Sequence, residues 1–307
     1  MKIVILDALT FGDTDLGGFD LFGDVKIYQT TSKEQTKERV TDADVIVTNK
    51  VVIDGKLMSE CKNLKLICVA ATGMNNIDLE SAKKMGIEVK NVAGYSTASV
   101  IQHTFSMLFY LVGHSRYYDE TIKSKAYSRG EIFTDVSKPF FEIKGKRWGI
   151  IGLGEIGRGV ADIAKAFGAE VVYYSTSQKN NNPLYKQESL EDILKTCDII
   201  SIHAPLNEQT DNLIDYEQLL MCKNGAVVLN LGRGGIINED AVAKIVDEKD
   251  ISFGLDVFVK EPLAENSPLL KVKNADRLYL TPHIAWTSIE ARERLIKSII
   301  ENISSLK

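Results

Sequence analysis

Cysteine is scarce in this sequence, which has four among 307 residues and no Cys-x-x-Cys pair. So few residues at such spacing exclude a disulfide framework and do not match a structural zinc site. Three of the four lie in or beside apolar runs, so we expect buried thiols and no bound metal. The cysteines are Cys61, Cys68, Cys197 and Cys222.

Long apolar runs and excess positive charge are also missing. No apolar stretch approaches the ~20 residues of a membrane-spanning helix, and residues 1–7 have a strand pattern rather than that of a signal peptide. The formal net charge of −5 gives no reason to expect nucleic acid as a partner. We therefore expect a cytoplasmic protein that acts on a small molecule, with local positive charge for an anionic substrate.

Glycines stand where a nucleotide-binding loop needs them. The strand pattern 148–151 leads into Gly152, Gly154 and Gly157, in G-x-G-x-x-G spacing, and then into an apolar-periodic helix pattern. In such a loop the first glycine turns the chain, the second admits a pyrophosphate to the backbone, and the third lets the helix pack against the strand. The helix N-terminus supplies free N–H groups to the anion. Because glycines also serve ordinary turns, the motif depends on its context.

That context is a repeated alternation of strand and helix patterns. It is typical of parallel sheets covered on both faces, and it predicts an α/β fold with two doubly wound parallel-sheet domains. The predicted strands are 2–7, 25–29, 44–48, 66–70 and 87–91 in the first domain, and 148–151, 170–174, 199–202, 226–230, 251–256 and 277–280 in the second.

A long apolar segment, 98 to about 124, is predicted to be one helix that connects the domains. One face would pack on the second sheet and another on a partner subunit, so we expect a homodimer. Its His103 and His114 are interpreted as hydrogen-bonded packing or surface histidines. An irregular excursion is expected at 125–144, and an amphipathic helix at 288–306.

Three reactive side chains follow three predicted strands of the second domain: Arg233, Glu261 and His283. In an open α/β sheet the ligand lies outside the carboxyl ends of the strands. Each residue alone has a structural explanation, as a surface arginine in a glycine turn, a loop corner or a histidine placed by chance. Together, beside the glycine loop, they predict a site with a cation, a carboxylate and an imidazole.

These residues belong to a series of motifs that resembles the D-isomer-specific 2-hydroxyacid dehydrogenases over almost the whole chain. Within that family, segments 71–78, 95–97 and 102–104 look most like the glycerate dehydrogenase or hydroxypyruvate reductase branch. The resemblance implies a Rossmann dinucleotide-binding domain and a flavodoxin-like substrate domain. The family motifs are GLGEIG at 152–157, SIHAPL at 201–206 with Thr210, NLGRGG at 230–235, LDVF at 255–258 followed by Glu261-Pro262, and TPHIAW at 281–286.

The resemblance further implies an oxidoreductase that transfers hydride reversibly between NAD(H) and a small D-2-hydroxy acid/2-keto acid pair. Hydroxypyruvate/D-glycerate and glyoxylate/glycolate are the leading pairs. Arg233 would hold the substrate carboxylate through two parallel hydrogen bonds, a geometry that lysine cannot reproduce. His283 would give a proton to the keto oxygen, and Glu261 would favour the protonated imidazole.

The same resemblance implies roles for both domains: residues 1–98 with 286–307 would bind the substrate and 99–285 the dinucleotide. Substrate contacts would come from Lys50, Thr72, Gly73, Arg233, His283 and Trp286, although Lys50 reads equally well as a solvated lysine. Asp256 would meet the nicotinamide carboxamide. The full set of expected dinucleotide contacts is Thr72, Thr104, Gly152, Gly154, Glu155, Ile156, Gly157, Ser175, His203, Ala204, Pro205, Thr210, Leu231, Gly232, Arg233, Asp256, His283 and Trp286.

One departure from the family pattern concerns the cofactor. Ser175 stands about 20 residues past the glycines, where NAD enzymes of this fold usually carry Asp or Glu. No carboxylate stands there to repel the 2′-phosphate of NADP, and no arginine stands nearby to bind it. Lys179 is only a weak candidate for that contact. NAD is favoured and NADP stays open. The alternatives are a corepressor-like protein of the same fold that senses NAD(H), and a D-lactate-type dehydrogenase.

Overall fold

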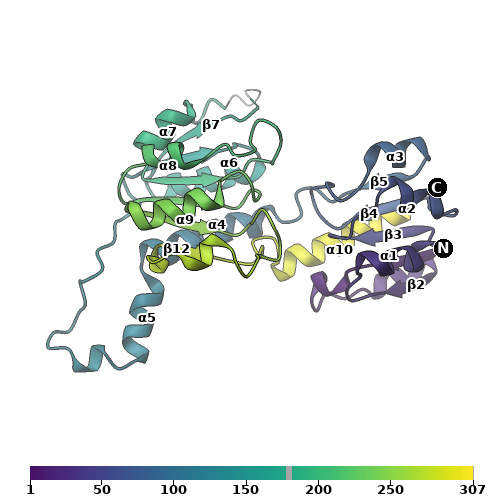
Figure 1. Cartoon of the computed structure of the whole chain (residues 1–307), viewed down its shortest axis with the longest axis horizontal. Coiled ribbons are helices and arrows are strands. Elements are labelled where there is room, and N and C mark those ends of the chain that lie inside the picture. The colour runs from purple at the N-terminus through teal and green to yellow at the C-terminus, as the bar shows by residue number, and fades with distance from the viewer. Residues whose placement is uncertain (178–181, 307) are drawn as a thin grey trace. The chain divides into compact units, whose positions relative to one another are not determined.

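The computed structural model describes residues 1–177 and 182–306, which form two compact units (Figure 1). The first unit comprises Met1–Ser96 and Trp286–Lys307, and the second comprises Thr97–Ala285. Each contains one parallel sheet, which confirms the predicted fold class. Within the described residues, no helix is long and apolar enough to cross a membrane.

The first unit is a five-stranded sheet in the order β2-β1-β3-β4-β5. Alternate strand residues enter different cores, which explains the continuous apolar runs. Ile3 and Ile5 pack with helix α10, whereas Val4 packs in the core that includes Val40 of α1. The elements are β1 Lys2–Ile5, β2 Asp24–Ile27, β3 Val45–Thr48, β4 Leu66–Val69, β5 Glu88–Lys90, α1 Lys33–Val40, α2 Gly55–Glu60, α3 Leu79–Lys84 and α10 Ile289–Ser304, with 3-10 turns at Ala8–Phe11 and Gly17–Phe22.

The second unit is a seven-stranded sheet in the order β12-β11-β10-β9-β6-β7-β8. The sequence predicted six of these strands and missed β8, whose two residues are exposed and carry no apolar signal. The elements are β6 Arg147–Ile151, β7 Glu170–Tyr174, β8 Lys186–Gln187, β9 Ile199–Ile202, β10 Ala226–Asn230, β11 Ile251–Leu255, β12 Leu278–Leu280, α4 Thr97–Val112, α5 Ser115–Lys123, α6 Glu155–Ala166, α7 Leu190–Thr196, α8 Tyr216–Met221 and α9 Glu239–Glu248, with 3-10 turns at Tyr127–Arg129, Pro268–Lys271 and Ala275–Arg277.

The prediction of a single helix over 98–124 is wrong, because the chain breaks at Gly113-His114 into α4 and α5. His114 has a positive φ of 45°, which no α-helix can continue. Helix α5 has no buried residue, and together with the chain that follows it projects from the body of the second unit (Figure 1). We call residues 115–142 the arm.

The four cysteines are free and buried, in agreement with the expectation of buried thiols. Burial raises the pKa of the Cys68 and Cys197 thiols to about 12, and that of Cys61 and Cys222 to about 11. These groups are therefore neutral packing residues at physiological pH.

Candidate active site

The glycine loop forms at the carboxyl end of β6 as the motif predicts. Gly152 has a φ of 91°, and a Cβ there would lie 2.9 Å from the Ala204 backbone. A Cβ on Gly157 would lie 2.2 Å from the Gly152 carbonyl oxygen, so only glycine lets α6 approach the strand this closely.

Gly154 differs from both, because its Cβ would meet no other part of the described chain within 4 Å. It is the N-cap of α6 and makes no side-chain cap hydrogen bond. The first N–H groups of this 12-residue helix therefore receive no side-chain cap from Gly154. This cradle fits a pyrophosphate, and the adjacent Glu155 and Ile156 begin the helix.

Loops after the neighbouring strands pack against the glycine loop. A Cβ on Gly232 would lie 2.7 Å from the Ala204 carbonyl oxygen. Thr210 is fully buried and donates its hydroxyl to the carbonyl oxygen of Pro205 at 2.6 Å. Leu231 is buried too. The predicted residues from three consecutive motifs thus lie along one edge of the sheet.

His203, after β9, carries an unusual buried atom. Its Nε2 lies 3.1 Å from the Ser201 hydroxyl, whereas its buried Nδ1 has no hydrogen-bond partner within the residues that the structure describes. Burial lowers the pKa of His203 to about 3, so the imidazole is neutral. A polar group supplied by a bound ligand would satisfy this nitrogen.

Two other predicted cofactor residues are buried. Ser175, after β7, is fully buried, and Lys179 lies outside the described residues. Thr104 is buried in α4 and donates its hydroxyl to the Val100 carbonyl oxygen at 2.8 Å. That bond accounts for the Thr104 hydroxyl within its own helix, so its predicted contact with the dinucleotide stays a prediction.

Arg233 follows β10 in a turn fixed by the side chain of Asn230, which sequence reasoning had not singled out. Asn230 accepts the Gly232 N–H at 3.0 Å and donates to the Arg233 carbonyl oxygen at 2.9 Å. The Arg233 side chain itself is exposed, with Nη1 2.8 Å from the Gly232 carbonyl oxygen. A rigid backbone thus carries an accessible guanidinium.

Glu261 and His283 are brought together from loops after β11 and β12. Glu261 Oε2 lies 2.8 Å from His283 Nδ1, and the two side chains are 28% and 22% exposed. The other carboxylate oxygen accepts the Phe258 N–H at 3.1 Å. A Cβ on Gly234 would lie 2.0 Å from the Phe258 carbonyl, so the loop of Arg233 also rests on the loop of Glu261.

Asp256 holds the loop that carries His283. Its carboxylate is 1% exposed and accepts hydrogen bonds from the Thr281 hydroxyl at 2.6 Å and from the N–H groups of Ile284 and Ala285 at 2.8 and 2.9 Å. His103 of α4 extends this network, since its Nε2 lies 3.2 Å from the Thr281 hydroxyl. This contact confirms its interpretation as a hydrogen-bonded packing histidine, and burial lowers the pKa of His103.

The predicted substrate contacts of the first unit lie in loops at the carboxyl edge of that unit's sheet or, for Trp286, beside its core. Lys50, after β3, is exposed, and the Thr72 hydroxyl, after β4, lies 3.2 Å from the Val92 carbonyl oxygen. Gly73 follows in the same loop. Trp286 packs edge-on against Tyr95, with ring centroids 6.2 Å apart.

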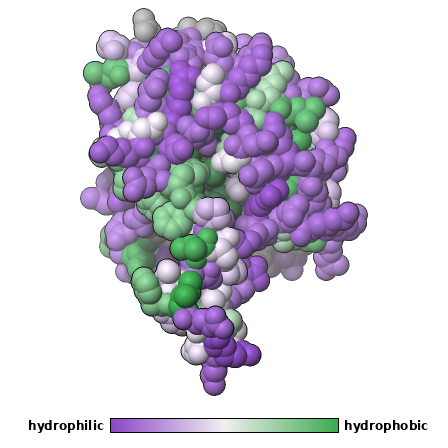
Figure 2. Space-filling model, turned by 90° about the vertical axis from the view of Figure 1, so that its left-hand side faces the viewer, coloured by the Kyte–Doolittle hydropathy of each residue, from purple (hydrophilic) through white to green (hydrophobic). Residues whose placement is uncertain are grey.

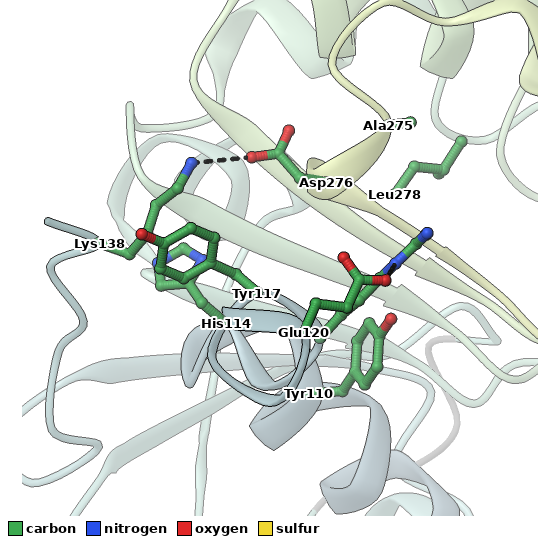
Figure 3. Close-up of a pocket in the computed structure, with 9 residues that line it drawn as sticks. Tyr110, His114, Tyr117, Glu120, Lys138, Ala275, Asp276 and Leu278 are labelled. Atoms are coloured by element: carbon green, nitrogen blue, oxygen red, sulfur yellow. Dashed lines mark hydrogen bonds and ion pairs between the residues drawn. The ribbon is translucent and has the colours of Figure 1, made fainter. Parts of the chain in front are cut away.

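A separate cavity of about 320 Å³ lies where the base of the arm meets the second unit, and none of the predicted site residues lines it (Figure 3). Its charged side chains are paired with one another: Arg116 with Glu120 at 2.8 Å and Lys138 with Asp276 at 3.3 Å. Across the described residues, no group of His, Cys, Asp or Glu side chains could hold a metal ion.

Comparisons with known proteins identify the family of the chain. Residues 105–285 match the family model described as D-isomer specific 2-hydroxyacid dehydrogenase, NAD binding domain. A hydroxypyruvate reductase of Blautia hydrogenotrophica is 33% identical over 99% of this chain and 96% of its own, and a glycerate dehydrogenase of Methylorubrum extorquens is 31% identical over 99% and 95%.

The solved structures give the same result. The D-lactate dehydrogenase of Aquifex aeolicus, complexed with NAD and lactic acid, superposes with a TM-score of 0.85 at 26% identity, covering 99% of this chain and 95% of that one. The family model spans more than half of the chain, and its NAD-binding domain includes the glycine loop and the Glu261–His283 pair. The chain belongs to the D-isomer-specific 2-hydroxyacid dehydrogenase family, the NAD-linked oxidoreductases of hydroxy and keto acids.

Proposed function

We propose that this protein reduces hydroxypyruvate to D-glycerate with NADH and catalyses the reverse reaction, with glyoxylate/glycolate as a second pair. The observation that carries the proposal is the Glu261–His283 pair at the sheet edge that also holds the glycine loop. An imidazole fixed by a carboxylate can hold and release a proton, as reduction of a keto group requires.

His283 would act as the proton donor. Because a carboxylate only accepts hydrogen bonds, His283 donates its Nδ1–H to Glu261. In the imidazolium form a second proton lies on Nε2, and this is the proton that the keto oxygen would receive. Glu261 stabilises the imidazolium by its charge, and the Phe258 N–H fixes the orientation of that carboxylate. The proton passes from Nε2 to the keto oxygen as that oxygen becomes a hydroxyl, and returns in the oxidative direction.

Arg233 would hold the substrate carboxylate. A guanidinium can donate two parallel hydrogen bonds to a carboxylate, and the Asn230 side chain fixes the turn from which it reaches out. This arrangement would select acids and fix their orientation toward His283.

NAD(H) supplies the hydride, and the open cradle at Gly154 is where its pyrophosphate would bind. The predicted partners at this edge are the residues of the 152–157 loop, with His203, Ala204, Pro205, Thr210, Leu231 and Gly232 from adjacent loops. Asp256 would meet the carboxamide in addition to holding the His283 loop. Ser175 lacks the charge that repels a 2′-phosphate, but the sequence near it carries no arginine that would bind one, so NAD is proposed as the preferred cofactor, with NADP as a weaker one.

The first unit, 1–98 with 286–307 in the predicted boundaries, would supply the rest of the substrate site. Lys50, Thr72, Gly73 and Trp286 are its proposed contributors. The loops after β3 and β4 carry three of them, as expected for a ligand that binds outside the carboxyl ends of parallel strands.

Two alternatives remain as outcomes of a test. A D-lactate-type dehydrogenase would prefer pyruvate, but the curated relatives described above carry names of hydroxypyruvate and glycerate enzymes. A corepressor-like sensor of NAD(H) is not favoured by those names either. It would bind the nucleotide without turning over any keto acid.

We also propose that the protein is a cytoplasmic homodimer. The arm exposes large apolar side chains that a monomer would leave in water: Ile132 is 63%, Phe133 88%, Val136 76% and Phe140 66% exposed. Figure 2 views the molecule from the left-hand side of Figure 1. It shows apolar surface both in the middle of that face and on the part that projects below it. Four free cysteines are in keeping with a reducing compartment.

A second copy of this chain is the occupant that fits the arm. The base of the arm is fastened by the ion pair between Lys138 and Asp276 (Figure 3). The His114 Nε2, which lies 3.1 Å from the Pro139 carbonyl oxygen, adds a second contact there. An arm held at its base but apolar along its length is suited to lie across an identical partner.

The test is the initial rate of NADH and NADPH oxidation at 340 nm with hydroxypyruvate, glyoxylate, pyruvate and a bulky aromatic keto acid. The proposal expects the highest kcat/KM with hydroxypyruvate and NADH. Faster turnover of pyruvate would favour the lactate-type reading, and nucleotide binding without turnover of any keto acid would favour the sensor.

A further inference from the structure

A buried carboxylate lies beneath the loop that carries Lys50. Asp7 follows β1, is 6% exposed, and has no role in the chemistry proposed above. Strands β1 and β3 are neighbours with Ile5 opposite Val47, so continuing this register places Asp7 opposite Asn49. In the sequence, Asp7 appears only as the end of an apolar strand and gives no signal of a further role.

Three consecutive backbone N–H groups converge on the Asp7 carboxylate. Asn49 donates at 2.9 and 3.0 Å to its two oxygens, Lys50 donates at 2.7 Å and Val51 at 3.4 Å. The Thr48 hydroxyl adds a contact at 3.4 Å and accepts the Val51 N–H at 3.0 Å. Such a ring of N–H groups around an anion compensates a buried charge and fixes the backbone that supplies it.

The loop that carries Lys50 is also hydrogen-bonded to the loop after the neighbouring strand, β4. Asn76, in the loop after β4, donates its side-chain amide to the Val51 carbonyl oxygen at 3.0 Å, and its own carbonyl accepts the Ile53 N–H at 2.9 Å. Thr72 and Gly73 belong to that same loop. Asp7 and Asn76 therefore hold the Lys50 loop from two sides, and Asn76 links it to the loop that carries Thr72 and Gly73.

We propose that Asp7 is a positioning residue for substrate binding, which sets the backbone of residues 49–51 so that Lys50 meets the substrate carboxylate. The inference rests on the proposed function, since it takes Lys50 as a substrate contact. An isolated buried carboxylate would be costly, and a neutral residue could link two strands as well. We therefore explain the presence of a carboxylate at this position by its hydrogen bonds to the backbone of residues 49–51.

The test compares Asp7→Asn with Asp44→Asn in the full-length protein. Asp44 is a matched control, because it also accepts a backbone N–H from the neighbouring strand, that of Lys2 at 2.7 Å, but precedes β3 at the opposite edge of the sheet. Hydrogen–deuterium exchange of peptides that cover 45–53 reports the loop without any need for turnover. We expect faster exchange there in D7N alone.

The kinetic readout is the KM for hydroxypyruvate. We expect D7N to raise it about tenfold or more with a smaller change in kcat and an unchanged Kd for NADH, and D44N to leave it near the wild-type value. In the background of Lys50→Met, D7N should raise KM no further, because the two changes remove the same contact.

The outcomes separate the two proposals. Unchanged exchange in D7N, or a raised KM in K50M with a wild-type KM in D7N, overturns the role of Asp7 and leaves the proposed function intact. A wild-type KM in K50M overturns the role of Lys50 and with it the inference. If the wild-type protein reduces no keto acid, the proposed function fails, while the exchange measurement still decides whether Asp7 holds the loop.

Discussion

The two units share one architecture and differ in the loops at the carboxyl edges of their sheets. In the second unit that edge carries a glycine loop with an open helix N-terminus and a carboxylate–imidazole pair. In the first unit the edge is held by side chains, those of Asp7 and Asn76, that bind loop backbone. The comparison indicates that the fold only defines a position for a site, and that the loop residues determine which groups each edge offers to a ligand.

The largest expected effect is at His283, which is the proposed proton donor at the carboxyl edge of the second unit's sheet. His283→Ala should lower kcat about a hundredfold or more and change the Kd for NADH far less, because the other proposed dinucleotide contacts remain. Steady-state rates and fluorescence titration measure the two effects. His114→Ala is the control, since His114 belongs to the same unit but lies in the arm junction. Near-wild-type turnover in H283A would remove His283 from the mechanism.

A second change tests the cation on the same edge. Arg233→Lys keeps the charge but loses the two-pronged geometry, so kcat/KM for hydroxypyruvate should fall about ten- to a hundredfold. Arg277→Lys, at a surface ion pair with Asp250, should leave it unchanged. Equal kcat/KM in wild type and R233K would contradict the carboxylate-binding role.

The glycines offer a sharper test of what makes the second edge a nucleotide site. Gly154→Val places its side chain in open space, so it should fold normally yet raise the Kd for NADH about tenfold or more. Gly157→Ala should instead cost about 1–3 kcal/mol of stability, because its Cβ would meet the Gly152 carbonyl oxygen. Calorimetry of both variants distinguishes them, and tight NADH binding by G154V would argue against the cradle.

The smallest effect on catalysis is expected from the arm. Phe133→Asp should leave the fold intact and convert a dimer to monomers, because a charge would be buried in an apolar interface. Analytical ultracentrifugation compares it with Leu270→Asp, which alters an exposed leucine outside the arm. A wild-type protein that sediments as a monomer would refute the homodimer proposal.

The sequence predicted the sheets, the glycine loop and the approach of Glu261 to His283, because each depends on local pattern and on strand ends that meet at one edge. The prediction failed for features that leave no recurring pattern in the sequence, such as a very short polar strand, a single change of backbone conformation, or a contact between residues far apart in the chain. Strand β8 has two polar residues, and the break before α5 is a single residue with positive φ inside an apolar run. The partners of Asp7 lie more than 40 residues away, so only the register of β1 and β3 reveals them.

The most direct test of the account is to follow the hydride itself. Hydroxypyruvate would be reduced with NADH that carries deuterium at both C4 positions of the nicotinamide, and the product analysed by mass spectrometry and chiral chromatography. The account predicts glycerate of the D configuration with one deuterium at C2. A product without deuterium at C2, or with the L configuration, would contradict it.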